Sequence, residues 1–222
     1  MRKRTVASIA FTGAAVMAGT GLNAHAAHAA SIGKWTVTNG GEFTATASLT
    51  HLTALSKGTV VDKLTCHVAT AAGSLSKATF SQSGNTPFQA GTTTGTFGNA
   101  SHECSSSKGA GLKFTATLKA GKLFASTNSG GVTHGTIKSI SASIKGTGIV
   151  GCSATFKGSQ PYSYNNTTGT LTVLGATSNA KDLKTTAVTG CAGLLKVSQS
   201  NFFSGAYSVA SPFPVITRTP AN

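Results

Sequence analysis

The chain of 222 residues carries 18 lysines and arginines against four aspartates and glutamates, which gives a formal net charge of +14. This length suits one domain, or two small similar ones, and suffices to bury a sizeable hydrophobic core. So few acidic residues argue against hydrolysis by paired carboxylates, while the basic surplus favours anionic partners.

The first 29 residues have the pattern of a secretory signal peptide. The basic start MRKR precedes an uncharged, apolar stretch from Thr5 to about Leu22, and AHAAHAA follows at 24–30. Small residues at the last and third-last leader positions predict cleavage after Ala26 or Ala29. The two histidines of AHAAHAA are then filler around the cleavage site and not a metal site, and the apolar stretch is short for a membrane span.

We therefore expect a freely secreted, extracellular protein of residues 30–222. Cleavage after Ala29 leaves 193 residues and a net charge of +11, with fourteen lysines and Arg218 as the only arginine. The lysines come singly, mostly at outward positions of predicted strands. They either protect sheet edges and aid solubility, or attract an anionic polymer such as cell-wall material. A specific nucleic-acid reader would add arginine forks and stacking aromatic residues, so none is expected.

Alternation of apolar and polar residues recurs along the mature chain, and no window longer than ten residues keeps a helical period. Clusters of Gly, Asn and Ser separate the alternating runs, as turns between strands do. The pattern predicts an all-β fold of antiparallel strands, with a β-sandwich preferred over a closed barrel. The clearest runs are EFTATASL (42–49), LKFTATLK (112–119), ISASI (140–144), VGCSATF (150–156), TLTVL (170–174) and AYSV (206–209).

Four cysteines remain after leader removal, and an even number in an exported chain favours disulfides over metal binding or catalysis. Three pairings are open. We favour Cys66 with Cys104 and Cys152 with Cys191, because the two gaps are 38 and 39 residues. The matched gaps also suggest a duplicated plan with two similar halves, 30–129 and 130–222.

An ordered series of short motifs spans most of the mature chain. It includes GKWTVTNGGEFTATA, LTC at 64–66, GVTHGTIKSISASIKG, GCSATFKG, YSYNNTTGTLTV, VTGCAGLL and FSGAYSV. In these motifs the chain resembles a group of uncharacterised secreted proteins from actinomycetes. The resemblance implies an exported β-rich domain with four cysteines. It implies no activity and transfers no catalytic or binding residue.

Motifs that could carry catalysis are few. GTGIVG at 146–151 fits the dinucleotide fingerprint, but a strand follows it where the fingerprint needs a helix, so we interpret it as a turn between strands. No serine stands in a nucleophile elbow. The acidic residues are far apart in sequence, and each is expected to be an isolated surface partner of a lysine. They are Glu42, Asp62, Glu103 and Asp182.

Two constellations could bind a ligand. A bridge between Cys66 and Cys104 would bring His67 and His102 together, although two histidines fall short of a closed zinc shell and no metal site is assigned. Tyr162 and Tyr164 share one strand face beside amide side chains. With Trp35 they form either an exposed platform for stacking sugars or part of the core.

The sequence thus favours a secreted, non-enzymatic β domain associated with the cell surface through an anionic wall polymer or glycan. A secreted enzyme or inhibitor with a loop-borne site is the alternative, and a small-ligand carrier is a further one. No catalytic residue, metal or cofactor is assigned, no membrane span is expected in the mature chain, and the oligomeric state stays open.

Overall fold

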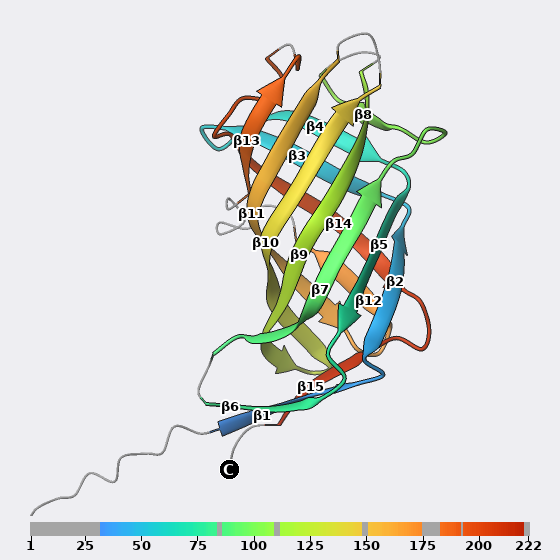
Figure 1. The fold of residues 1–222 in the computed structure, drawn as a ribbon, viewed down its shortest axis with the longest axis vertical. Coiled ribbons are helices and arrows are strands. Elements are labelled where there is room, and N and C mark those ends of the chain that lie inside the picture. The colour runs from blue at the N-terminus through green and yellow to red at the C-terminus, as the bar shows by residue number, and fades with distance from the viewer. Residues whose placement is uncertain are drawn as a thin grey trace, which may run out of the picture.

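The computed structural model describes residues 32–83, 86–108, 112–147, 151–174, 183–191 and 193–219, and Figure 1 shows its fold. The predicted leader, residues 1–29, lies outside these ranges. The described residues form fifteen β-strands, which confirms the all-β prediction. Among them there is no helix of the length and apolar character that crossing a membrane requires.

Eight antiparallel strands close into a barrel. In chain order they span Gly41–Ala47 (β2), Ala69–Leu75 (β5), Phe88–Phe97 (β7), Lys113–Ser129 (β9), Val132–Gly146 (β10), Ser153–Asn165 (β11), Thr170–Val173 (β12) and Ser200–Val209 (β14). Around the ring the order is β10, β11, β12, β14, β2, β5, β7 and β9, and β9 pairs back with β10. Because every strand has two hydrogen-bonded neighbours, this ring has no open edge.

Four of these strands, β9, β10, β11 and β14, also take part in a second ring. The shorter strands that complete it are Thr50–Ser56 (β3), Thr59–Cys66 (β4), Cys104–Ser106 (β8) and Leu183–Thr189 (β13). Its order is β9, β10, β11, β13, β14, β3, β4 and β8, which pairs with β9. The molecule is one elongated barrel, which is the barrel-like alternative of the predicted all-β fold and not the sandwich, because the strands shared by both rings close each ring without a free edge.

Alternation along each strand decides which side chains fill the barrel. In β2, Phe43, Ala45 and Ala47 are buried and their neighbours are exposed, as the period of two predicts. Leu49, expected on the same face, lies beyond the end of β2 and is 47% exposed. Strands from both proposed halves of the chain contribute to this single interior.

Glycines opposite aromatic rings allow the strands to bend around the interior. Gly73 pairs with Phe43, and Gly135 pairs with Tyr162. A Cβ atom at Gly135 would overlap the backbone oxygen of Phe124 and lie 2.7 Å from the Tyr162 ring. The ring therefore occupies the space that a side chain at the glycine would need, as in sheets curved by glycine kinks.

A three-stranded sheet closes one end of the barrel, at the bottom of Figure 1. Its strands are Ile32–Thr38 (β1), Thr79–Ser83 (β6) and Val215–Thr219 (β15), with β1 in the centre. Trp35 on β1 stacks on Phe88 of β7 with ring centroids 5.9 Å apart. The Asn166 side chain both donates to the Ile216 carbonyl (2.7 Å) and accepts from its N–H (2.9 Å), so it binds β15 as a neighbouring strand would.

Both predicted disulfides are present. Cys66 is bonded to Cys104 and Cys152 to Cys191, which joins the ends of β4 and β8 and the ends of β11 and β13. Loops of 38 and 39 residues correspond to about 4 kcal/mol of stabilisation each in the chain-entropy model. Each bridge stays within one of the two proposed halves, and the duplication itself remains a prediction.

Replacing Gly135 by alanine should reduce the free energy of unfolding by about 2 kcal/mol or more, because the added methyl group has no space between two strands. Chemical denaturation measures this change. The matched control is Gly33→Ala on β1, where the new Cβ atom meets the flexible Arg218 guanidinium at 3.1 Å. Equal losses in the two variants would show that the contact with Tyr162 and Phe124 is not the cause.

Candidate functional site

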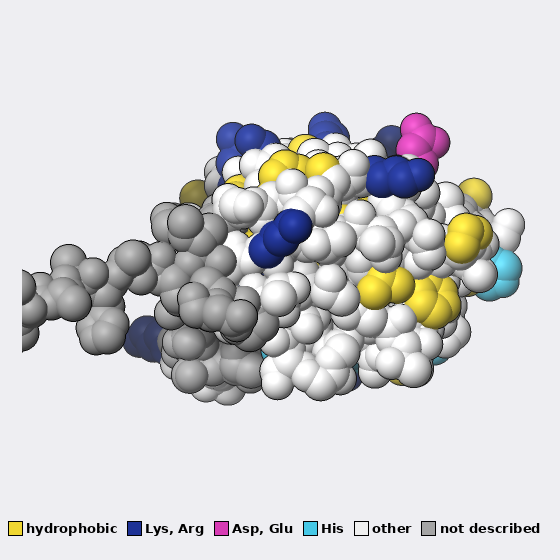
Figure 2. All heavy atoms as spheres, turned by 90° about the horizontal axis from the view of Figure 1, so that it is seen from below, with side chains coloured by type: hydrophobic (Ala, Val, Ile, Leu, Met, Phe, Trp, Pro, Cys, Tyr) yellow, Lys and Arg dark blue, Asp and Glu magenta, His cyan; other side chains and the backbone are white. Residues whose placement is uncertain are grey.

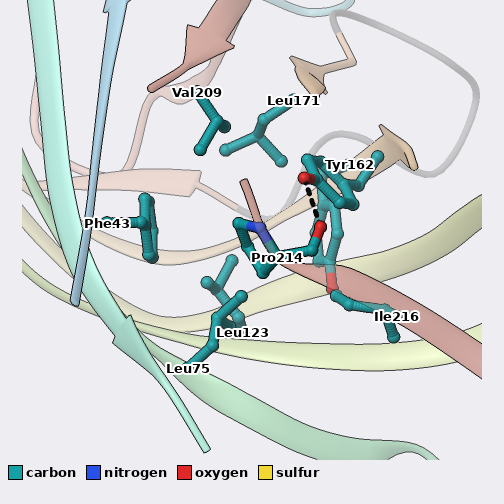
Figure 3. Close-up of a pocket in the computed structure, with 9 residues that line it drawn as sticks. Phe43, Leu75, Leu123, Tyr162, Leu171, Val209, Pro214 and Ile216 are labelled. Atoms are coloured by element: carbon teal, nitrogen blue, oxygen red, sulfur yellow. Dashed lines mark hydrogen bonds between the residues drawn. The ribbon is translucent and has the colours of Figure 1, made fainter. Parts of the chain in front are cut away.

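The three aromatic residues considered for a sugar platform are all in the interior. Tyr162 is 2% exposed, Tyr164 is 4% exposed and Trp35 is 1% exposed. Figure 3 shows Tyr162 among the apolar side chains inside the barrel, and the Tyr164 hydroxyl donates a hydrogen bond of 2.6 Å to the Pro214 carbonyl. Stacking on a sugar needs an exposed ring face, so the platform prediction is corrected and these residues belong to the core.

The space left inside the barrel is small. A cavity of about 20 Å³ lies between Tyr162, Phe43 and Ile216, and another of about 40 Å³ lies between Phe97, Phe203 and related core side chains. Cavities of this size hold one or a few water molecules. Neither of these two cavities, which are lined by described residues, has room for a small-molecule ligand.

The acidic residues that the structure describes do not come together. Glu42 is exposed on β2, and Glu103 lies 3.6 Å from the Lys113 ammonium, as expected of a surface partner. Asp62 was predicted to lie at the surface as a partner of a lysine, but it is buried, with only 3% of its surface exposed. Asp182 lies outside the described residues. Nothing in this arrangement places two carboxylates on either side of a substrate.

Asp62 anchors the end of β8 and the residues that follow it. Its carboxylate accepts hydrogen bonds from the Ser106 hydroxyl (2.9 Å), the Ser107 hydroxyl (3.0 Å) and the Lys63 N–H (2.8 Å). These hydrogen bonds offset the free-energy cost of removing the carboxylate from water. The serines bind the carboxylate directly, with no histidine between them as a catalytic triad would require, so the cluster is structural.

His51, His67 and His102 belong to or flank strands of the second ring, and none of the three is buried. His51 on β3 is opposite Thr65 on β4, and its pKa is lowered first by partial burial and then by the charges of Lys63 and His67. His67 is therefore close to His51. The described residues contain no group of three or more potential metal ligands, and the pairing of His67 with His102 remains a prediction.

GTGIVG links two paired antiparallel strands. β10 ends at Gly146 and β11 begins at Ser153, and the two strands pair with each other. A strand follows the motif where a dinucleotide site needs a helix. The interpretation as a connection between strands is confirmed.

An open groove of about 730 Å³ crosses the outer face of β2 and β5. Small side chains such as Thr44, Ala72 and Ser74 form its floor, and Glu42 and Lys77 are the charged residues that line it. By the order of the ring, this groove is on the opposite wall from β10 and β11.

Seven exposed lysines project from four adjacent strands of the other wall. We call this surface the lysine face. Figure 2 shows basic side chains gathered along the side of the molecule that faces the viewer in Figure 1, where β9 and β10 lie. Its members are Lys113, Lys119 and Lys122 on β9, Lys138 and Lys145 on β10, Lys157 on β11, and Lys184 on β13.

Two pairs of these lysines are directly opposite each other on neighbouring strands. Lys122 pairs with Lys138, and Lys157 pairs with Lys184. Opposed residues have Cβ atoms about 5 Å apart, and like charges at this position are destabilising. The Lys138 ammonium lies 4.8 Å from the centre of the Phe124 ring, a contact that partly offsets the repulsion.

Acidic residues do little to neutralise the lysine face. Of the described acids, Glu103 contacts Lys113, while Glu42 is on the opposite wall and Asp62 is buried on β4. From Lys138 to Lys145 the face extends about 23 Å along β10, and four strands give it a width of about 14 Å. It is an extended basic surface suited to a polymer.

Two β-bulges lie side by side at the centre of the lysine face. Ser139 has no Cα partner on β9 or β11, and Lys119 has none on β10 or β7. Ser139 has φ of 54°, a value uncommon outside glycine. A bulge turns outward a residue that strict alternation would turn inward, and as a result Lys119, Ala120, Lys138 and Ser139 are all exposed.

The sequence shows each of these lysines singly but gives no sign of their grouping. Cross-strand register and bulges bring them together, and neither can be read from alternation alone. Comparisons with known proteins identify no relative: no family model, curated protein or solved structure matches this chain.

Burial of the tyrosines predicts a distinctive alkaline titration. All three tyrosines of the protein are buried, and burial raises the pKa of Tyr164 to about 12 and raises those of Tyr162 and Tyr207 as well. Because the folded state holds these protons more tightly than the unfolded state, stability present below about pH 10 should decline as the pH rises toward 12.

We expect tyrosinate absorbance to appear together with the loss of the β-sheet circular dichroism signal, not before it. The two signals are recorded in one pH titration. Ionisation of any tyrosine near its ordinary pKa of about 10 while the protein stays folded would contradict the buried positions.

Charge reversal in the lysine pairs should stabilise the fold. Lys122→Glu and Lys157→Glu each convert a repulsive pair into an attractive one, which predicts a gain of about 0.5 kcal/mol per pair in the free energy of unfolding at low salt. The gain should shrink at high salt, since exposed charges are screened. The control Lys34→Glu faces Thr219 and Ser81 and should give no comparable gain.

Proposed function

We propose that this protein is a secreted, non-enzymatic β-barrel that associates with an anionic polymer of the cell surface or wall through its lysine face. The two opposed lysine pairs are the observation that carries the proposal. Stability alone would favour a lysine opposite an acid or a neutral residue. A bound anion that contacts both ammonium groups of a pair would remove their repulsion, which gives a reason for two lysines to be opposite each other.

The charge distribution supports a polymer as the partner. A polyanion that crosses the lysine face would neutralise several ammonium groups at once and release its condensed counterions, which favours binding at low and moderate salt. Several weak contacts along one chain also reinforce one another, because the second contact is formed within an existing complex. Two disulfides are compatible with an extracellular protein.

The type of basic residue supports a structural polymer over sequence-specific recognition of nucleic acid. Base readout depends largely on arginine and amide side chains. The lysine face contains lysine alone, and Arg218 is in the terminal sheet, where its guanidinium lies 5.6 Å from the centre of the Trp35 ring. The expected interaction therefore depends on charge density and not on base sequence.

The non-enzymatic assignment is supported by the interior and by the acids. The two cavities described within the barrel are too small for a substrate or a carried ligand, and the described carboxylates are separated. These points also favour the surface-binding proposal over an enzyme, an inhibitor with a catalytic-type site, or a ligand carrier.

Retention of the mature, oxidised protein on insoluble material tests the proposal. We expect retention on anionic cell wall at low salt, loss of retention at high salt, and no retention on the uncharged glycans cellulose and chitin. The double variant Lys122→Glu/Lys157→Glu should bind the wall more weakly while being more stable than the original protein.

A double variant with the same net charge, Lys34→Glu/Lys196→Glu, provides the control and should retain more binding. Retention that survives high salt, or that is equal on neutral glycans, would refute attraction by charge. Turnover of a substrate by the purified protein would refute the non-enzymatic assignment.

A further inference from the structure

We propose that the centre of the lysine face is a site for phosphate groups, and that the polymer it binds is a phosphodiester. We call this site the bulge cluster. It consists of Lys119, Lys122, Lys138 and Lys157 together with the hydroxyl of Ser139. The inference rests on the proposed function and adds to it the chemical class of the ligand.

The two bulges give the bulge cluster its geometry. Ser141 on β10 lies between the lysines of the two neighbouring strands, since it is opposite Ala120 on β9, next to Lys119, and opposite Lys157 on β11. Lys122 and Lys138 are opposed on the other side of the bulges. Lysines from three neighbouring strands therefore surround one point, where regular alternation would have turned part of the set into the core.

The conformation of Ser139 is a second observation at the same point. A serine with φ of 54° has a higher backbone conformational energy than a glycine would have at this position. Residues strained in this way are enriched at binding sites, where the surrounding structure holds them in place. Serine instead of glycine here adds an exposed hydroxyl donor to a group of ammonium donors. Bulges next to binding sites commonly serve to redirect side chains in this way.

The donor set suits phosphate better than carboxylate. A planar carboxylate is matched by the fork of arginine, and the lysine face has none. A tetrahedral phosphate presents oxygens in several directions and accepts hydrogen bonds from separate ammonium and hydroxyl groups, the usual contacts to phosphate in nucleic-acid complexes. Lys113, Lys145 and Lys184 extend the basic surface beyond the cluster, so neighbouring phosphates of one chain would also find partners.

The test compares two soluble polymers of matched length and charge, poly(glycerol phosphate) and poly(glutamate), by calorimetry with the full mature, oxidised protein at one low salt concentration. We expect poly(glycerol phosphate) to bind at least about tenfold more tightly. Replacing Lys119, Lys122, Lys138 and Lys157 by glutamine should abolish this difference. The matched control replaces Lys34, Lys57, Lys77 and Lys196 by glutamine, which removes the same charge from other surfaces and should preserve the difference.

The outcomes separate the two proposals. Binding of both polymers with equal affinity would overturn the phosphate site and leave the charged face intact. Equal losses in the two quadruple variants would show that binding does not depend on the lysine face and would overturn both proposals. Binding of neither polymer would overturn the proposed function and the phosphate site together. All eight replaced lysines are exposed, and unchanged thermal midpoints would confirm that the variants remain folded.

Discussion

Closure of the hydrogen-bonded ladder is the constraint on which the other features depend. Because β9, β10, β11 and β14 pair within two rings, their register fixes which residue is opposite which, and whether each side chain points into the barrel or outward. Apolar side chains must then fit into an interior of limited width, which explains glycines opposite Phe43 and Tyr162. The same closure sets the outward residues in register, so that Lys122 meets Lys138 and Lys157 meets Lys184.

The two walls of the barrel differ in what they offer to a partner. The wall of β2 and β5 carries an open groove with small side chains and one residue of each charge. The wall of β9, β10, β11 and β13 carries basic charge with a single acidic contact and two bulges. A fold selected for stability alone would distribute its lysines more evenly, and their concentration on one wall is the reason why we propose binding there.

Sequence patterns predicted the parts of this structure that depend on local chemistry. Alternation identified the strands, the cysteine gaps identified both disulfides, and the strand after GTGIVG argued correctly against a dinucleotide site. Alternation left the sandwich and the barrel as alternatives, because barrel closure depends on pairing between distant strands. Tyr162 and Tyr164 were known to share a face, but alternation cannot say which face is inside. Asp62 was expected at the surface. Its burial could not be predicted, because the serines that bind its carboxylate are more than forty residues away along the chain.

The terminal sheet has a consequence for how the chain acquires its structure. Its central strand, β1, is the first described strand and pairs with β15, the last, so that Trp35 is opposite Arg218. Contacts this distant in sequence form slowly, because a long loop must close before they contribute. During synthesis the segment around Trp35 is made early, and its pairing with β15 must wait until the last strand has been made. Until then Trp35 is open to chaperones and proteases, and its burial marks the moment at which folding is complete.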